Sequence, residues 1–364
     1  MGICSYRLTE TCFTNQTMAN GLIPFQITTA NEHRGINAAV SFTKSVSLTV
    51  NNLTIELGEN NILTIDQIEL NPPQTKSLGN ITIEIIYATK GIRIQTSFGL
   101  GVLFDGVSRV TVSVPDSYAG QMCGMCGNMN GNTNDEWLVG DGSVVTDSNL
   151  WGNSWISSLQ DEPNCNKLNL TLPHGLCDSN SDPIVQTKCG ILISPTGPFS
   201  PCHRLVDPQS IYPSCYFDMC SDPKNNDLLC SAYQIYADQC LVTGILLDWR
   251  SSTGCTVKCG ANEHYETVTS GCQASCDDPH AVDSCHLRDT SGCVCNDGFL
   301  RSGTTCTPKE QCGCYAVGDI WFTDFCSTKN RCSGTNSVVK DPNVQCHEYG
   351  ECFNSTASGE SECR

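Results

Sequence analysis

The chain has 364 residues, 27 cysteines and a formal net charge of −18. A chain of this length usually forms two or three domains. Such a density of cysteine is typical of secreted proteins, in which disulfides replace part of the apolar core. The acidic balance repels phosphate backbones and argues against nucleic acid as a partner. The density of cysteine therefore leads us to expect a secreted, extracellular protein. No stretch approaches the ~20 apolar residues that a membrane-spanning helix needs, so we expect no membrane span.

The N-x-[ST] triplet, the acceptor for N-linked glycans, supports secretion and occurs five times. The triplets begin at Asn15, Asn52, Asn80, Asn169 and Asn354. Met1 is followed by GICSYRLTETC and not by the basic and apolar segments of a signal peptide. We therefore expect the chain to be an internal piece of a longer secreted protein.

Before residue 123 the chain has only two cysteines, Cys4 and Cys12, so this part must fold mainly by ordinary packing. Apolar and polar residues alternate there at 46–50, 53–57, 81–85 and 110–114. This is the period of a strand with one buried face. Turn-forming residues separate the runs at 51–52, 58–60, 71–73 and 90–91. The pattern predicts an antiparallel β-sandwich.

A set of eight cysteines marks a second region, which we expect to be a small helical module with four disulfides. The set is Cys177, Cys189, Cys202, Cys215, Cys220, Cys230, Cys240 and Cys255. Within it, Leu229, Tyr233 and Tyr236 recur with Cys240 at helical spacing. The helix is predicted to begin near Asn226 or Asp227 and to end before Gly244.

The two last segments, 259–312 and 314–363, are dense in cysteine and show almost no periodicity. We expect Cys-rich modules with little regular structure, held by disulfides because they have little core to bury. The fold class is therefore mainly β, with small disulfide-rich modules.

Several stretches resemble a known family. CSYRLTETC, NEHRG, VLFDGVSRVTVSVP and CGMCGNMNGNTNDEW resemble the von Willebrand factor type D domain. The eight-cysteine set ending in LLDWRSSTGC resembles the module that follows it in that family. CGANEHYETVTSGC and GCVCNDGFLRSGTTCTPKEQCGC resemble the trypsin-inhibitor-like module, and YAVGDIWFTDFC resembles the closing extension.

The resemblance covers nearly the whole chain and implies four parts. These are a D domain at 1–165, an eight-cysteine helical module at 166–257, a trypsin-inhibitor-like module at 258–313 and a Cys-rich extension at 314–364. Assemblies of this kind occur in tandem in long secreted proteins of the zonadhesin and IgG-Fc-binding type. The family's opening Gly-Asp-Pro-His strand and Thr-Phe-Asp-Gly turn do not precede Cys4, so we expect a D domain without its first strands.

The resemblance also implies disulfide pairs. They are Cys4–Cys165, Cys12–Cys123, Cys259–Cys293, Cys272–Cys285, Cys276–Cys312 and Cys295–Cys306, with Cys126 left unpaired. The alternative for Cys123 and Cys126 is a redox dithiol, which requires an exposed, electropositive site that lowers a thiol pKa. The acidic surroundings favour structural cysteines, and the scattered histidines do not favour zinc.

A calcium site is the second implication, because Ca²⁺ binds carboxylate, amide and carbonyl oxygens. The implied ligands are Asn128, Asn130, Asn132, Asn134 and Asp135. The alternative is a turn whose asparagine amides cap their own backbone. The family's first ligand is the aspartate of the missing turn, so the expected affinity is reduced.

The sequence favours a non-enzymatic, adhesive module of a mucus or matrix protein. Its expected partners are glycoproteins, mucins, matrix proteins or copies of itself. The first alternative is a serine protease inhibitor, with Arg288 of the HLRDTSG loop in the protease pocket. Val268 stands where a cysteine of such modules is expected, and this weakens that alternative. Thiol–disulfide exchange at CGMC is the second alternative.

Overall fold

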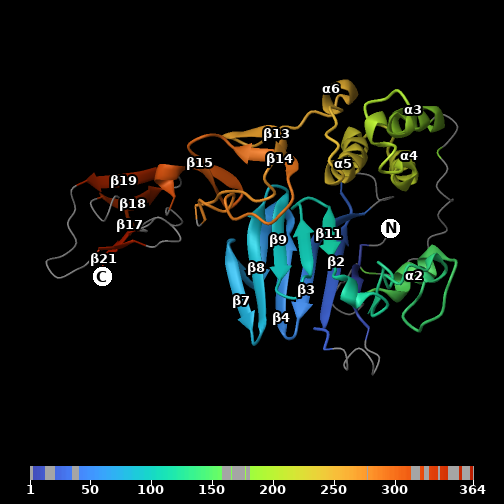
Figure 1. Cartoon of the computed structure of the whole chain (residues 1–364), viewed down its shortest axis with the longest axis horizontal. Coiled ribbons are helices and arrows are strands. Elements are labelled where there is room, and N and C mark those ends of the chain that lie inside the picture. The colour runs from blue at the N-terminus through green and yellow to red at the C-terminus, as the bar shows by residue number, and fades with distance from the viewer. Residues whose placement is uncertain are drawn as a thin grey trace. The chain divides into compact units, whose positions relative to one another are not determined.

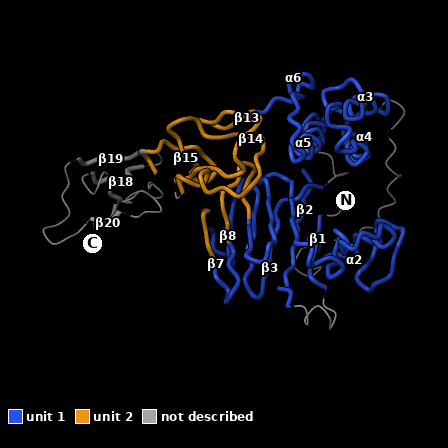
Figure 2. The backbone as a smooth tube through the Cα atoms, in the orientation of Figure 1, with its two compact units in different colours: residues 1–70, 77–83, 94–257 blue, residues 71–76, 84–93, 258–364 orange. Residues whose placement is uncertain are grey.

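The computed structural model describes residues 3–12, 21–34, 41–157, 165, 177, 181–276 and 278–312, and five strands beyond residue 319. The chain forms two compact units (Figure 2). Unit 1 contains residues 1–70, 77–83 and 94–257, and unit 2 contains residues 71–76, 84–93 and 258–364. None of the helices in the described part combines the length and apolar character that a membrane crossing demands.

Two sheets form the predicted β-sandwich (Figure 1), with residues of β3 and β10 in contact. The seven-stranded sheet has the order β12 (Met122–Cys123), β1 (Ser5–Thr11), β2 (Phe25–Glu32), β3 (Phe42–Val50), β4 (Leu53–Gly58), β5 (Ile62–Ile65) and β6 (Ile68–Leu70). The five-stranded sheet has the order β11 (Val110–Ser113), β10 (Gly101–Phe104), β9 (Gly91–Thr96), β8 (Ile81–Ala88) and β7 (Gln74–Leu78).

The alternation in the sequence places one face of each strand in the core. Leu48 on β3 and Ile55 on β4 are each 1% exposed. In the other sheet, Ile94 on β9 and Val102 on β10 are fully buried. All four predicted runs form strands, although Val114 lies just beyond β11.

The helical module is confirmed. Its helices are α3 (Asp182–Ile193), α4 (Tyr212–Ser221), α5 (Asn226–Val242) and α6 (Arg250–Thr253), and α2 (Ser148–Ser154) precedes them. The Asn225 side chain caps α5 by accepting hydrogen bonds from the backbone of Asp227 and Leu228, which fixes the start of the helix where the sequence predicts it. Short 3-10 turns lie at Glu59–Asn61, Asp116–Tyr118, Thr133–Asp135, Ser200–Cys202, Pro208–Ser210 and Lys309–Gln311.

Four disulfides and an aromatic cluster hold this module together. The disulfides are Cys177–Cys220, Cys189–Cys215, Cys202–Cys240 and Cys230–Cys255. The ring of Phe199 lies 5.2 Å from Tyr233, 5.7 Å from Tyr236 and 5.7 Å from Trp249, measured between ring centroids. Both tyrosine hydroxyls donate to backbone carbonyls, so the buried polar atoms of this core have partners.

Unit 2 contains more strand than its composition indicates. Its paired strands are β13 (Glu263–Thr269) with β14 (Thr290–Cys295) and β15 (Phe299–Ser302) with β16 (Thr305–Pro308). The tail forms a sheet of order β19 (Ser337–Pro342), β18 (Thr328–Gly334), β17 (Ile320–Thr323), β21 (Ser361–Cys363) and β20 (Cys352–Asn354). The strands β13 to β16 are short and are held by disulfides, not by the burial of a broad apolar face. Their sequences therefore show no alternation of apolar and polar residues.

A buried polar network supports this part of unit 2. The Arg301 guanidinium donates to Glu263 over 2.5 Å and to the Gln273 side chain over 2.7 Å. Gln273 in turn donates to the carbonyl of Cys293 over 2.7 Å. The side chains of Arg301 and Glu263 are only 12% and 9% exposed, so each charge depends on the other for stabilisation.

Backbone pairing joins the same part of unit 2 to the end of β8. Ala88 forms a β-bridge with Cys272, and Thr89 donates from its backbone to Gly271 over 3.0 Å. The Thr89 hydroxyl donates to the carbonyl of Ser270 over 2.5 Å. These contacts hold the loop between β13 and β14 against the turn between β8 and β9.

Candidate metal centre

The stretch from Cys123 to Trp137 follows the short edge strand β12. Cys123 pairs with Glu10 of β1, and the chain continues along β1 because Met125 and Cys126 donate to the carbonyls of Arg7 and Leu8. Between them Gly124 adopts a φ of +117°, and a Cβ atom there would lie 2.7 Å from the Leu8 carbonyl oxygen. Only glycine allows the backbone to pass this close to β1.

The asparagines that follow form a ladder of side-chain to backbone hydrogen bonds. The Asn128 side-chain oxygen accepts from the backbone of Asn130 over 3.1 Å, and that of Asn130 accepts from Asn132 over 2.7 Å. The Asn132 side-chain oxygen accepts from the backbone of Asn134 over 3.2 Å. This is the self-capping alternative, and it places a row of side-chain oxygens along one loop.

Asp135 closes the ladder. One of its carboxylate oxygens, Oδ2, accepts from the amides of Asn128 over 3.3 Å and of Asn130 over 2.8 Å. The other, Oδ1, is buried and has no hydrogen-bond donor within the described ranges. A buried carboxylate oxygen without a donor is costly, and a cation bound there would satisfy it.

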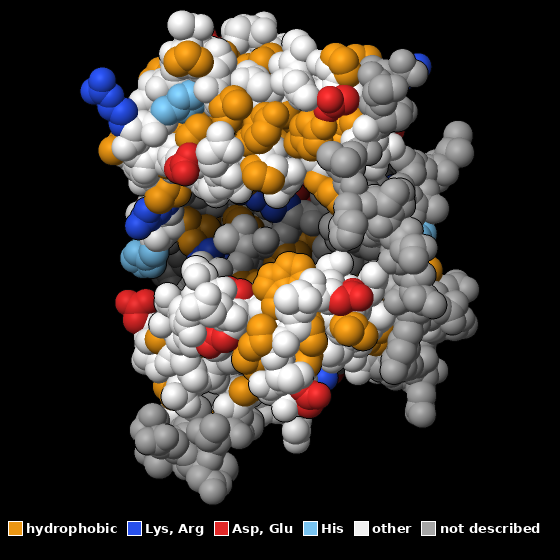
Figure 3. Space-filling view, turned by 90° about the vertical axis from the view of Figure 1, so that its right-hand side faces the viewer, with side chains coloured by type: hydrophobic (Ala, Val, Ile, Leu, Met, Phe, Trp, Pro, Cys, Tyr) orange, Lys and Arg blue, Asp and Glu red, His pale blue; other side chains and the backbone are white. Residues whose placement is uncertain are grey.

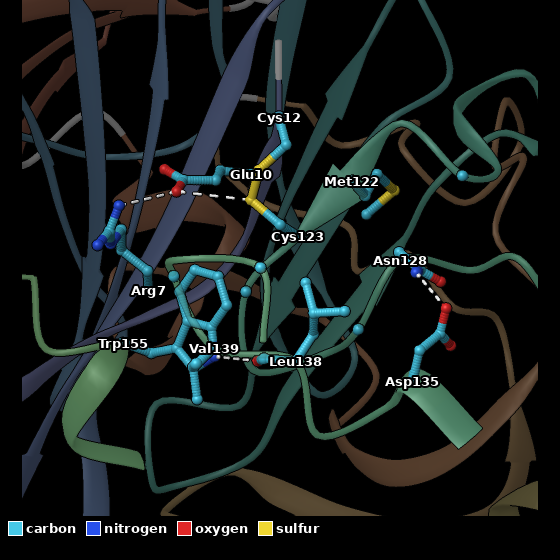
Figure 4. Close-up of a pocket in the computed structure, with 15 residues that line it drawn as sticks. Arg7, Glu10, Cys12, Met122, Cys123, Asn128, Asp135, Leu138, Val139 and Trp155 are labelled. Carbon is cyan, nitrogen blue, oxygen red and sulfur yellow. Dashed lines mark hydrogen bonds and ion pairs between the residues drawn. A yellow bond between two sulfur atoms is a disulfide. The ribbon is translucent and has the colours of Figure 1, made fainter. Parts of the chain in front are cut away.

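The loop forms one wall of a cavity of about 430 Å³. In Figure 4, Asn128 and Asp135 lie on one side of this cavity and Arg7, Glu10 and the disulfide of Cys12 on the other. The full lining is Arg7, Glu10, Cys12, Gly120, Met122, Cys123, Gly124, Gly127, Asn128, Asp135, Leu138, Val139, Gly140, Gly142 and Trp155. Five of the lining residues are glycines, so backbone atoms rather than side chains form much of the wall beside the polar groups.

Three contacts position the far wall. Arg7 donates to Glu10 over 3.0 Å, and its guanidinium carbon lies 5.5 Å from the centre of the Trp155 ring. The indole nitrogen of Trp155 donates to the carbonyl of Leu138 over 3.2 Å. The arginine charge is therefore compensated by Glu10 and by the aromatic face.

The donor set fits a hard cation. Asp135 provides one negative charge, and the amide oxygens of Asn128 and Asn130 each keep a lone pair beyond the backbone hydrogen bond that they accept. The Asn132 oxygen uses both of its lone pairs, because it accepts from the backbone and from the side-chain amide of Asn134. The Asn134 side chain instead donates its amide to Asn132 over 3.2 Å. A set with one carboxylate binds Ca²⁺ weakly, because affinity follows the number of ligand charges.

The cysteines of CGMC do not pair with each other. Cys123 is bonded to Cys12, with 5.7 Å between the two Cα atoms, and Cys126 is free with an exposed side chain. Although the residue is exposed, protein atoms around its sulfur partly desolvate the thiol and raise the pKa of Cys126. A nucleophilic thiolate needs the opposite shift.

The structure brings together the sulfurs of the six pairs that the resemblance implies. Besides Cys12–Cys123 these are Cys4–Cys165, Cys259–Cys293, Cys272–Cys285, Cys276–Cys312 and Cys295–Cys306. Within the described residues, both groups that gather two cysteines around a carboxylate contain one of these disulfides, so their sulfurs are bonded to each other.

The proposed inhibitor residue lies in a constrained loop. Arg288 is exposed, but its backbone carbonyl and Leu287 pack against Gly271, where a Cβ atom would approach the Arg288 oxygen to 2.5 Å. A substrate-like inhibitor loop has to present this carbonyl to the protease. Here the Arg288 carbonyl lies against Gly271 of the same trypsin-inhibitor-like module.

Of the predicted glycan acceptors, Asn52 and Asn80 are described and exposed. Asn15 and Asn169 lie outside the described residues, and only the backbone of Asn354 is described, in β20. The sequence reading did not find Arg7, Glu10 and Trp155, which line the cavity. Arg7 and Glu10 look like ordinary solvent-facing strand residues, and no local pattern links Trp155 to them.

Comparison with protein families explains the order of these parts. The von Willebrand factor type D domain matches residues 1–143, the C8 domain residues 188–256, and the trypsin-inhibitor-like cysteine-rich domain residues 259–312. The chain belongs to the von Willebrand factor type D family and is a D assembly, that is, a type D domain followed by a C8 domain and a trypsin-inhibitor-like domain. The boundaries at 165, 257 and 313 that we drew from the sequence remain predictions.

Curated relatives align with nearly the whole D assembly. Zonadhesin from Sus scrofa is 35% identical over 347 residues, which cover 93% of this chain and 14% of zonadhesin. Human alpha-tectorin is 33% identical over 383 residues, covering 100% of this chain and 16% of alpha-tectorin. Human IgGFc-binding protein is 36% identical over 382 residues, covering 100% of this chain and 7% of that protein. The chain thus spans less than a fifth of the length of these relatives.

Proposed function

We propose that this D assembly is an adhesive module of a secreted mucus or matrix protein, and that it binds glycoproteins or further copies of itself. The observation that carries the proposal is the set of disulfides that cross-links each domain of the chain. Ten disulfides in the described residues close loops in the sandwich, the C8 domain and the trypsin-inhibitor-like domain. Such cross-links persist outside the cell and keep binding surfaces in place.

Exposed hydrophobic side chains support a role in protein contacts. They gather on the face of the molecule shown in Figure 3. Trp137 is 42% exposed and its ring lies 5.6 Å from that of Trp151. Leu150, which precedes Trp151 in the chain, is 60% exposed. Trp151 itself is half-buried, so one exposed tryptophan and one exposed leucine form this surface, and exposed apolar and aromatic side chains of this kind occur at protein interfaces.

Calcium is part of the same proposal. Asp135, Asn128 and Asn130 would hold the ion, and Asp135 Oδ1 would gain the partner that the described residues do not provide. A bound Ca²⁺ supplies positive charge and oxygen coordination that fix the loop. The consequence for adhesion is a stiffer wall beside the exposed Trp137.

A binding measurement tests the proposal. The secreted chain is passed over immobilised gel-forming mucin, immunoglobulin G and a copy of itself, in calcium and in EGTA. We expect saturable binding to at least one of the three surfaces, and its loss after reduction of the disulfides. Absence of binding to all three by a folded chain would contradict the adhesive function.

The inhibitor alternative is tested separately by titrating trypsin with the same protein. The packing of the Arg288 carbonyl against Gly271 leads us to expect trypsin activity to stay unchanged. Stoichiometric inhibition that disappears in Arg288→Ala would instead favour the inhibitor.

A further inference from the structure

Two glycan acceptors occupy matching positions in the β-sandwich. Asn52 is the second residue of the two-residue turn between β3 and β4, and Asn80 is the second residue of the turn between β7 and β8. Each follows a residue with positive φ, +52° at Asn51 and +63° at Gly79. Both asparagines are exposed.

The threonine of each triplet belongs to an adjoining strand. Thr54 of β4 is exposed, and Thr82 of β8 is half-buried with its backbone donating to the Ser97 hydroxyl over 3.0 Å. A glycan on either asparagine therefore extends from a turn and leaves the strand pairing intact.

A continuous set of contacts places the two turns at the same end of the sandwich. Val50, which precedes the first turn, pairs with Phe25 on β2. The Phe25 ring lies 6.5 Å from the Phe98 ring in the β9–β10 turn. Ser97 of that turn donates to the carbonyl of Thr82 over 2.8 Å, two residues beyond the second acceptor.

The opposite end of the sandwich carries a protein contact. β4 ends where Asn60 donates to the carbonyl of Gly106 over 2.9 Å, so the β10–β11 turn lies at the end of β4 away from Asn52. From this turn Arg109 contacts Asp238 of the C8 domain over 2.6 Å. One end is thus occupied by a neighbouring domain, and the other presents two exposed acceptors.

We propose that Asn52 and Asn80 both carry N-linked glycans, which together cover the end of the β-sandwich opposite the C8 contact. A secretory location supplies the glycan donor, and the exposure of both turns leaves room for the sugars. The glycans make this end a hydrated surface and exclude it from close protein contact. Partner binding then takes place on the remaining surfaces of the assembly.

The experiment is secretion of the full chain from mammalian cells behind a cleavable leader, followed by peptide mass spectrometry with and without peptide-N-glycosidase. We expect the peptides that contain Asn52 and Asn80 to carry glycans. Asn52→Gln and Asn80→Gln should each lower the apparent mass on an electrophoresis gel by the mass of one glycan, and the double variant should lower it by two.

The matched controls are Thr54→Ser and Thr82→Ser, which preserve the acceptor triplets, against Thr54→Ala and Thr82→Ala, which abolish them. The serine variants should keep the glycan even where a variant lowers the yield of folded protein. A secreted, protease-resistant chain in which either Asn52 or Asn80 is unmodified would overturn the assignment.

Discussion

Arg109 of the β-sandwich donates to Asp238 of helix α5 over 2.6 Å and so joins the D domain to the C8 domain. The Asp105 side chain fixes the turn that presents Arg109, because one of its oxygens accepts from the backbones of Val107, Ser108 and Arg109. Asp238 also accepts from the Gln234 amide over 2.6 Å. Both partners are thus held in place before they meet.

We expect Arg109→Ala to loosen this junction. The two side chains are 32% and 16% exposed, so the pair contributes about 1 kcal/mol to the free energy of unfolding. A double-mutant cycle with Asp238→Ala in chemical denaturation measures the coupling. Arg34→Ala, which removes an ion pair with Glu59 inside the sandwich, is the matched control and should leave the exchange of α5 amide protons unchanged. A coupling of zero would mean that the contact does not join the domains.

Asp135→Asn should abolish stabilisation by calcium. A ligand at a hundredfold excess over its Kd stabilises the native state by about 2.7 kcal/mol, so calcium should raise the melting temperature of the wild-type chain. The variant lacks the carboxylate that supplies the charge, and its melting temperature should be equal in calcium and in EGTA.

Asp141→Asn is the control for this prediction. Asp141 is a fully exposed carboxylate close in sequence, and its hydrogen bonds with Ser143 lower its pKa without involving the asparagine ladder. It should keep the calcium response of the wild type. An equal loss in both variants would place the ion elsewhere.

Cys126 should react slowly with alkylating reagents. Desolvation raises the pKa of this thiol, so at any pH below that pKa it has a smaller thiolate fraction than an ordinary cysteine, and the thiolate is the reactive form. Labelling with iodoacetamide should rise with pH along a curve displaced towards alkaline values relative to a cysteine peptide. Fast labelling at pH 6, absent from Cys126→Ser, would indicate an activated thiol and revive the redox alternative.

Glu263→Gln should destabilise the trypsin-inhibitor-like domain by about 3 kcal/mol, because it leaves the buried charge of Arg301 without its partner. Glu266→Gln is the comparison, because the Glu266 side chain is 41% exposed and, within the described residues, its ion pair is with the Nε2 atom of His264 at the surface. Partial proteolysis should release peptides of residues 259–312 earlier in the first variant than in the second. Equal rates would show that the network contributes little.

The sandwich and helix α5 were predictable because their residues carry periodic signals. Leu48 and Ile55 alternate with polar neighbours, and Leu229, Tyr233 and Tyr236 recur at helical spacing. Such patterns reflect the burial of one face and are visible in a short window of sequence.

The cavity beside the asparagine ladder was not predictable in the same way. Arg7 and Trp155 are separated by most of the D domain. They meet because β1 pairs with the segment after α2, where the Arg7 backbone donates to the Trp155 carbonyl over 2.7 Å and Tyr6 forms a β-bridge with Ile156. The strands around Arg301 were hidden for a different reason. Their cohesion comes from disulfides and the contact with Glu263, and neither leaves an apolar period in the sequence.

The bond between Cys4 and Cys165 has a sequence separation of 161 residues and encloses nearly all of the D domain. A protease that cuts one peptide bond between these cysteines opens the chain without releasing a piece, because both products stay attached through sulfur. The damaged molecule keeps its mass apart from one water molecule, and the cut becomes visible only on a reducing gel. In an environment rich in proteases, the assembly can therefore be nicked and still remain a single covalent body.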